Sequence, residues 1–228
     1  MALILSIDTS TKVCSVALHR EGNLIAFSQY FMEKSHSSIL TNLIAEVVRN
    51  SSHEMKDINA VAISEGPGSY TGLRIGTSTA KGICFALDVP LIAVSTLMSM
   101  CRGVARSNYR KSLLCPMIDA RRMEVYSLIC NHELQIVKDI SPMIIDEQSF
   151  EDLLSKQEIL FFGDGSEKCQ PVIGGSKNAV FLPDVHPSAR DIGDLGWAKY
   201  QNNEFADLAY FEPFYLKAFR AGKPKQLV

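Results

Sequence analysis

The chain has 228 residues, of which 46% are hydrophobic and 21% are charged, and its formal net charge is -2. This composition is typical of a globular protein that buries a sizeable core, and the length suits one large domain or two small ones. A protein whose only task is to grip nucleic acid is usually basic, so that role is disfavoured as an independent activity.

The cysteines indicate a reducing compartment. No two of them form a C-x-x-C pair, and several lie within apolar runs, which predicts buried, reduced thiols and not a disulfide framework or a zinc site. No stretch near the N-terminus resembles a signal peptide, and no apolar run is long enough to span a membrane. We therefore expect a cytoplasmic protein with no membrane contact. The six cysteines are Cys14, Cys84, Cys101, Cys115, Cys130 and Cys169.

The first half of the chain predicts an antiparallel meander followed by alternating helices and strands. A helix after Ser35 carries a broad apolar face that includes Ile39 and Leu43. The turn Asp8-Thr9-Ser10 could present backbone N–H groups to a phosphate, although taken alone its residues favour a plain polar hairpin turn. Strands are predicted over residues 3–7, 13–20, 24–31, 61–63 and 91–95, and helices after residue 35 and over residues 71–87.

A glycine-rich strand–turn–helix unit organises this half. Gly66, Pro67 and Gly68 form a turn signal, and Ser69 can cap the helix that follows. If Gly68 adopts a positive φ, a Gly68→Val substitution is expected to destabilise the turn. The helix itself contains three glycines, each costing about 1 kcal/mol relative to alanine. We therefore expect another backbone to approach it closely.

This helix has a second stripe of small and apolar residues besides the one that faces its own sheet. Two explanations stay open at this point: another helix, from this chain or from a partner, covers the second stripe, or the helix is buried all round in the core. In the first case, the outer faces of this helix and the helix after residue 35 form one docking surface. The second stripe consists of Thr71, Ile75, Ser78, Gly82 and Phe85, with Arg74 beside it.

The second half repeats the pattern of strand, polar turn, two strands, helix, strand and glycine turn, which hints at an internal duplication. We predict an N-terminal lobe over residues 1–105 and a C-terminal lobe over residues 106–228, whose tail packs back on the first lobe. Strands are predicted over residues 113–118, 124–130, 134–140, 159–162 and 180–182, and helices over residues 150–154 and 188–201.

Familiar catalytic signatures fail in this chain. The glycine spacing excludes a P-loop, and Thr71 stands where a dinucleotide fingerprint requires its third glycine. Ser78 lies inside a predicted helix and not at a nucleophile elbow, and no histidines pair at metal-binding spacing. We therefore expect no catalytic residue, no metal and no cofactor.

Several segments together resemble the TsaB (YeaZ) family. The most specific is the run GPGSYTGLRIG over residues 66–76. Others are ILSIDTS at 4–10, DAR at 119–121 followed by EVY at 124–126, and PFYL at 213–216. The resemblance implies an actin, sugar-kinase and chaperone-ATPase-like (ASKHA) fold, in which two related α/β lobes each carry a central sheet and helices.

The resemblance further implies a non-catalytic, dimerising subunit in the synthesis of threonylcarbamoyladenosine on tRNA. Its expected partners are a TsaD homologue, which transfers the threonylcarbamoyl group, and a TsaE homologue. We expect tRNA contact only through that complex, and a homodimer when the chain is alone. TsaD-like proteins carry a metal-binding histidine pair where this chain has Thr96 and Met100, and neither side chain replaces imidazole for a hard or borderline cation.

Two rival functions remain open. One is a glycoprotease-like metallopeptidase, which would require a metal or a nucleophile that the sequence does not show. The other is an independent nucleotide-binding ATPase built on Asp8, Thr9 and Ser10 together with the turn at residues 163–165.

Overall fold

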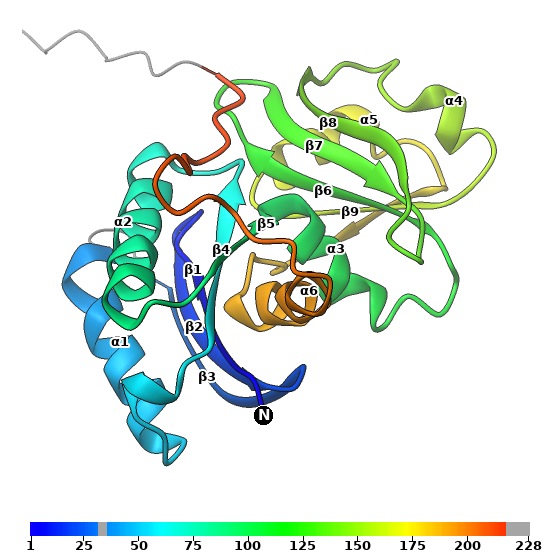
Figure 1. Cartoon of the computed structure of the whole chain (residues 1–228). Coiled ribbons are helices and arrows are strands. Elements are labelled where there is room, and N and C mark those ends of the chain that lie inside the picture. The colour runs from blue at the N-terminus through cyan, green and yellow to red at the C-terminus, as the bar shows by residue number, and fades with distance from the viewer. Residues whose placement is uncertain (32–35, 218–228) are drawn as a thin grey trace, which may run out of the picture.

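The computed structural model describes residues 1–31 and 36–217, and these residues form two lobes (Figure 1). The first lobe is built on a five-stranded mixed sheet with the strand order β3-β2-β1-β4-β5. β1 pairs antiparallel with β2 and parallel with β4. The strands are β1 (Leu3–Asp8), β2 (Val13–Arg20), β3 (Asn23–Phe31), β4 (Ala60–Gly66) and β5 (Leu91–Ser95).

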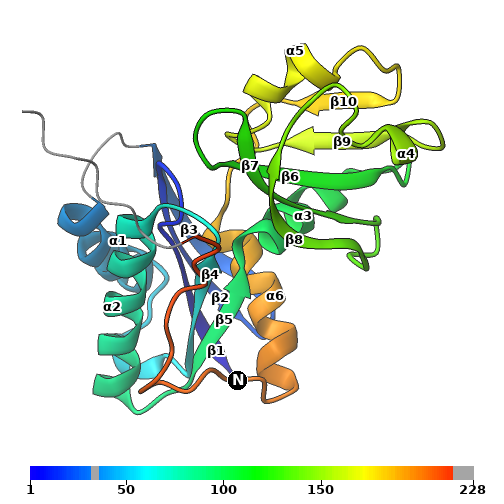
Figure 2. The same ribbon diagram turned by 90° about the horizontal axis from the view of Figure 1, so that it is seen from above.

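Helices cover both faces of this sheet. α1 (His36–Asn50) and α2 (Tyr70–Leu87) lie on one face, and α6 (Ala189–Gln201) lies on the other (Figure 2). Every residue of β1 is buried. Leu5 packs into the core beneath α1 and α2, whereas Ile4 packs with the residues beneath α6. The continuous apolar run of the first strand follows from this two-sided burial.

The second lobe repeats the arrangement of the first. Its five-stranded sheet has the order β10-β9-β6-β7-β8, so in both lobes an antiparallel meander of three strands is extended by two parallel strands. This repeated order is the internal duplication that the sequence pattern indicates. The strands are β6 (Leu113–Asp119), β7 (Glu124–Cys130), β8 (Ile136–Ile144), β9 (Ile159–Phe162) and β10 (Ala179–Leu182).

The connecting helices cross between the lobes. α3 (Thr96–Ala105) follows β5 but places Leu97, Met100 and Cys101 in a core shared with the second sheet. α6 follows the second sheet but packs on β1 and β2. A division at residues 105 and 106 therefore separates the two sheets, whereas the helices that cover them are exchanged across it.

Several element boundaries differ from the predicted ones. β8 runs over residues 136–144 instead of 134–140, because a turn from Asn131 to Gln135 precedes it and Leu134 has a φ of 65°. The predicted helix start at Ser35 lies outside the described residues. The short helix predicted over residues 150–154 is α4 (Glu151–Leu154). Three short elements were not predicted: the 3-10 helices η1 (Met55–Asp57) and η2 (Glu167–Cys169), and the helix α5 (Gln170–Ile173).

The six cysteines are free and buried, as predicted. Burial raises the pKa of the Cys115 thiol to about 12, which keeps it protonated and unreactive at neutral pH. Within residues 1–31 and 36–217, no helix is long and apolar enough to cross a membrane.

Candidate functional site

Two of the three glycines of α2, Gly72 and Gly76, pack against the turn between β1 and β2. A Cβ on Gly72 would overlap the carbonyl oxygen of Thr9, and a Cβ on Gly76 would lie 2.5 Å from the Thr9 hydroxyl oxygen. The Thr9 hydroxyl donates to the carbonyl of Gly72 over 2.8 Å. The predicted close approach of another backbone is therefore confirmed for Gly72, and that backbone belongs to the first hairpin of the same lobe. Gly76 is instead approached by the Thr9 side chain of the same hairpin.

The turn that precedes α2 is constrained differently from the prediction. Gly66, and not Gly68, has the left-handed backbone, with a φ of 118°. Gly68 is required for space, because a Cβ there would overlap the carbonyl oxygen of Ser10. Ser69 caps the helix as predicted, since its hydroxyl accepts a hydrogen bond from the Gly72 N–H. A Gly68→Val change is thus expected to be disruptive for a steric reason and not for a conformational one.

The predicted phosphate-contacting turn is closed over by this packing. Asp8, Thr9 and Ser10 are all buried. One carboxylate oxygen of Asp8 accepts hydrogen bonds from the backbone N–H and the hydroxyl of Ser10, each over 2.9 Å, whereas the other has no partner within the described residues. Burial raises the pKa of Asp8 to about 6 against the lowering effect of these hydrogen bonds. Nucleotide binding at these residues stays a prediction.

A cleft of about 1000 Å³ separates the lobes next to this turn. Lys12, Gly68 and Tyr70 line it from the first lobe, and Asp119 and Arg121 line it from the second. The second lobe also contributes Asp164, whose carboxylate accepts the Asp119 N–H over 3.0 Å. Phe214 to Lys217, which follow α6 at a distance in sequence, lie in the same cleft.

Thr96 and Met100, the positions where the resemblance to TsaD-like proteins would place a histidine pair, lie in α3. Thr96 and Met100 are both buried, and they sit four residues apart on one face of the helix. In the described part of the chain, no group of three or more His, Cys, Asp or Glu side chains gathers in a way that could hold a metal ion.

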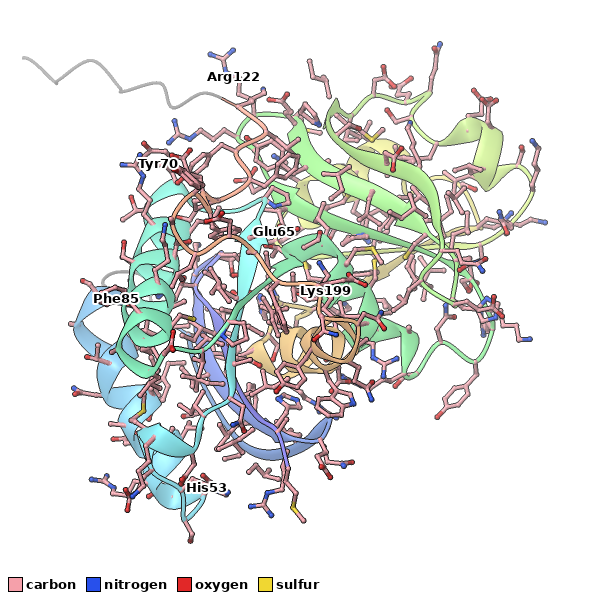
Figure 3. The ribbon with its side chains drawn as sticks, in the orientation of Figure 1. His53, Glu65, Tyr70, Phe85, Arg122 and Lys199 are labelled. Atoms are coloured by element: carbon pink, nitrogen blue, oxygen red, sulfur yellow. The ribbon has the colours of Figure 1, made fainter. Side chains whose placement is uncertain are left out.

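The second stripe of α2 faces solvent in the described structure. Thr71, Arg74, Ser78 and Gly82 are exposed, and Phe85 is 83% exposed although it is a large apolar residue. Figure 3 shows the Phe85 side chain projecting from α2. The alternative of a helix buried all round is therefore wrong.

The helix α1 contributes less apolar surface than predicted. Leu43 is 3% exposed and lies in the core of the first lobe, so its assignment to the docking surface is wrong. Ile39 and Ile75 are half-buried and pack against the same core. The apolar face of α1 serves its own sheet, and its outer face carries small residues such as Thr41 and Ala45. The small size of these exposed residues is the sequence feature that could have indicated that the outer face of α1 is not apolar.

Gly82 differs from the other glycines of α2. A Cβ at this position would meet no atom within 4 Å. An exposed glycine in the middle of a helix costs about 1 kcal/mol relative to alanine, and no contact with residues 1–31 or 36–217 requires it. We call the exposed residues Thr71, Arg74, Ser78, Gly82 and Phe85, with the half-buried Ile75, the α2 surface.

The two related lobes, each a meander extended by parallel strands and joined across a cleft, define a member of the actin, sugar-kinase and chaperone-ATPase class of folds. Solved structures agree with this. YeaZ from Pseudomonas aeruginosa has a TM-score of 0.82 at 24% identity, covering 95% of this chain and 100% of that one. A 2-hydroxyisocaproyl-CoA dehydratase activator from Clostridium difficile has a TM-score of 0.52 at 7% identity, covering 89% and 97%.

Sequence comparison identifies the family. Residues 30–225 match the family model "TsaD: tRNA N6-adenosine threonylcarbamoyltransferase". The tRNA threonylcarbamoyladenosine biosynthesis protein TsaB of Bacillus subtilis is 30% identical over 96% of this chain and 95% of its own length. The TsaB protein of Escherichia coli is 41% identical over 54% of this chain and 52% of its own length. The chain belongs to the TsaB (YeaZ) family and takes part in threonylcarbamoyladenosine biosynthesis.

Proposed function

We propose that this chain is a non-catalytic subunit that docks a TsaD homologue through the α2 surface. Together with a TsaE homologue, the pair forms threonylcarbamoyladenosine on tRNA, and the tRNA is bound by the complex as a whole. Membership of the TsaB family supports a role for this chain in threonylcarbamoyladenosine biosynthesis. The presence of Thr96 and Met100 at the positions of the histidine pair supports a division of labour in which the partner performs the transfer.

The observation that carries the docking proposal is the pairing of Gly82 with Phe85. Residues three apart on a helix share one face, so an open position and an exposed aromatic ring stand side by side there. A partner helix would approach closely over Gly82 and bury Phe85. This contact would offset the cost of a mid-helix glycine, which the fold of the isolated chain leaves unexplained.

A TsaD homologue of the same fold would present a matching helix pair, so the contact would be a pseudo-symmetric bundle of four helices. In the absence of that partner, the same surface pairs with a second copy of itself, because a self-complementary patch on one chain forms an isologous dimer. The homodimer therefore competes with the heterodimer.

The proposal is tested by co-purifying the chain with the TsaD homologue from its own source and by sedimentation of the chain alone. Phe85→Glu should abolish both dimers, because burial of an unpaired charge costs several kcal/mol. Gly82→Arg should do the same by filling the approach path, at a position where an added Cβ meets no atom within 4 Å. The matched control is Tyr109→Glu, which places the same charge at an exposed aromatic residue away from α2.

A transfer assay on tRNA, run with and without this chain, tests the function itself. Activity should depend on the chain and should fall with Phe85→Glu, but not with Tyr109→Glu. Cooperative melting at a temperature no lower than that of the native chain establishes that the variants fold. If both α2 variants still self-associate and still capture the TsaD homologue, the interface lies elsewhere.

A further inference from the structure

The last described part of the chain, residues 206–217, runs from the first lobe to the second without forming a helix or strand. It begins where Ala206 donates its N–H to the carbonyl of Leu91 over 2.8 Å, at the end of the first sheet. Figure 1 shows it in orange to red, passing between α2 and β4 and then rising to the second lobe. We call this segment the C-terminal strap.

The middle of the strap is held along the first lobe. The Lys81 ammonium group on α2 donates to the carbonyls of Ala209, over 3.0 Å, and Phe211, over 3.3 Å. The Phe214 N–H donates to the carbonyl of Glu65 over 2.7 Å. These bonds involve the backbone of the strap, so they fix its path with little dependence on its side chains.

Near its end, the strap contacts α2 through the aromatic side chain of Tyr215. The ring of Tyr215 lies 5.0 Å from the ring of Tyr70, centre to centre. Its hydroxyl accepts a hydrogen bond from Arg74 over 3.4 Å, and the Arg74 guanidinium lies 4.2 Å above the Tyr70 ring. Figure 3 shows Tyr70 at the end of α2 where the strap passes. Arg74 thus belongs both to the α2 surface and to the strap contact.

The strap then reaches the second lobe. Lys217 forms an ion pair with Glu124, the first residue of β7. This contact lies at the cleft, because Phe214 to Lys217 line it together with Arg121 and Tyr126 of the second lobe. Such a partly exposed ion pair is a weak interaction that salt or competing charges disrupt, which suits a contact that is made and released.

The lobes are otherwise joined away from this point. α3 carries the chain from β5 to β6, and Arg106, just after α3, forms ion pairs with Asp191 and Asp194 of α6. Although burial alone would raise the pKa of Asp194, the nearby His19 ring and the Arg106 guanidinium hold it well below its usual range. We call the side of the molecule where α3 and these charged contacts join the lobes the hinge side, and the strap spans the cleft on the other side.

We infer that the C-terminal strap fastens the two lobes across the cleft through the Lys217–Glu124 ion pair, and that its release lets the cleft open about the hinge. Resting on the proposed function, we extend this to regulation: a partner that engages Arg74 on the α2 surface withdraws it from Tyr215 and loosens the strap. Docking and cleft opening are then linked.

The test measures the width of the cleft with two spin labels in the full chain. The native cysteines are buried, so labels attach selectively at Lys12→Cys on the first lobe and Arg122→Cys on the second, both exposed. Labelled chain is diluted with unlabelled chain, so that distances between copies do not contribute. Pulsed electron-spin measurements then give the distribution of distances across the cleft.

The charge reversal Lys217→Glu places two acids together and should shift the distribution to longer, broader distances. The exchanged pair, Lys217→Glu with Glu124→Lys, should restore the native distribution, and Lys177→Glu, an exposed charge reversal elsewhere, should leave it unchanged. If the distance distribution of Lys217→Glu is unshifted, the proposal that the strap fastens the lobes is wrong. It is also wrong if the exchanged pair fails to reverse the shift. Melting curves check that each variant folds.

Adding the TsaD homologue to the labelled native chain tests the link to docking. Bound partner should lengthen the distance across the cleft, and bound partner without any change refutes the link. If no partner binds, the proposed function fails. The measurements on the isolated chain still test whether the strap fastens the two lobes.

Discussion

Asp8 offers a quantitative test of the packing of α2 on the first hairpin. Its side chain is fully buried, and burial raises its pKa to about 6. An unfolded aspartate titrates near pH ~3.9. Because the native state binds this proton more tightly, the free energy of unfolding falls as the pH rises from about 4 to about 6, and the loss is complete above that.

The magnitude follows from the size of the shift. A difference of roughly two pKa units, at 1.36 kcal/mol per unit, corresponds to about 3 kcal/mol of lost stability at neutral pH. Asp8→Asn removes this titration while its side-chain oxygen still accepts both hydrogen bonds from Ser10. The stability of the variant relative to the native chain should therefore improve by about 3 kcal/mol between pH 4 and pH 8.

Urea unfolding followed by the fluorescence of Trp197 provides the assay. Trp197 is the single tryptophan of the chain, and it packs beneath the first sheet with the residues of α6, so it reports on the lobe that contains Asp8. Glu46→Gln, at an exposed position of α1, is the control for general charge effects. A stability difference between the Asp8→Asn and native chains that stays constant from pH 4 to pH 8 would refute the reasoning.

Two further predictions concern α2 and the hinge. Gly82→Ala should stabilise the isolated chain by up to about 1 kcal/mol, because its Cβ meets open space, whereas Gly72→Ala should destabilise it, because its Cβ overlaps the backbone of the first hairpin. Equal melting temperatures for these two variants would contradict the packing. Arg106→Ala should cost up to about 3 kcal/mol, since it leaves the partly buried Asp191 without its cation and leaves Asp194 with Arg102 alone. Arg110→Ala, which breaks an exposed pair, should cost at most about 1 kcal/mol in the same urea titration.

The local pattern of the sequence was sufficient for most of the secondary structure. Strands with a buried face and helices with an apolar stripe have different periods, so the predicted bounds of β1, β2, β5 and α2 agree closely with the observed ones. The hydroxyl of Ser69 capped α2 as expected, because capping depends only on neighbouring residues. The run of residues 66–76 was specific enough to indicate the family, and hence the fold.

Other features depended on which backbone came to lie against which. The apolar face of α1 predicted that this helix packs against an apolar surface. Only the tertiary structure showed that Leu43 is buried in the core of its own lobe. The glycines of α2 likewise predicted that another part of the chain approaches this helix closely, but they did not indicate which part. The structure divides the glycines of α2 between the first hairpin, at Gly72 and Gly76, and open solvent at Gly82.

The C-terminal strap was the feature least accessible to the sequence. Lys217 and Glu124 are 93 residues apart, and no local sequence pattern predicts that they pair. Local sequence governs hydrogen bonds and side-chain contacts between near neighbours, and this is why helices, turns and caps could be predicted. Contacts between distant segments exist only once both lobes have folded and been brought together, so the tertiary structure alone decided which charged groups meet across the cleft.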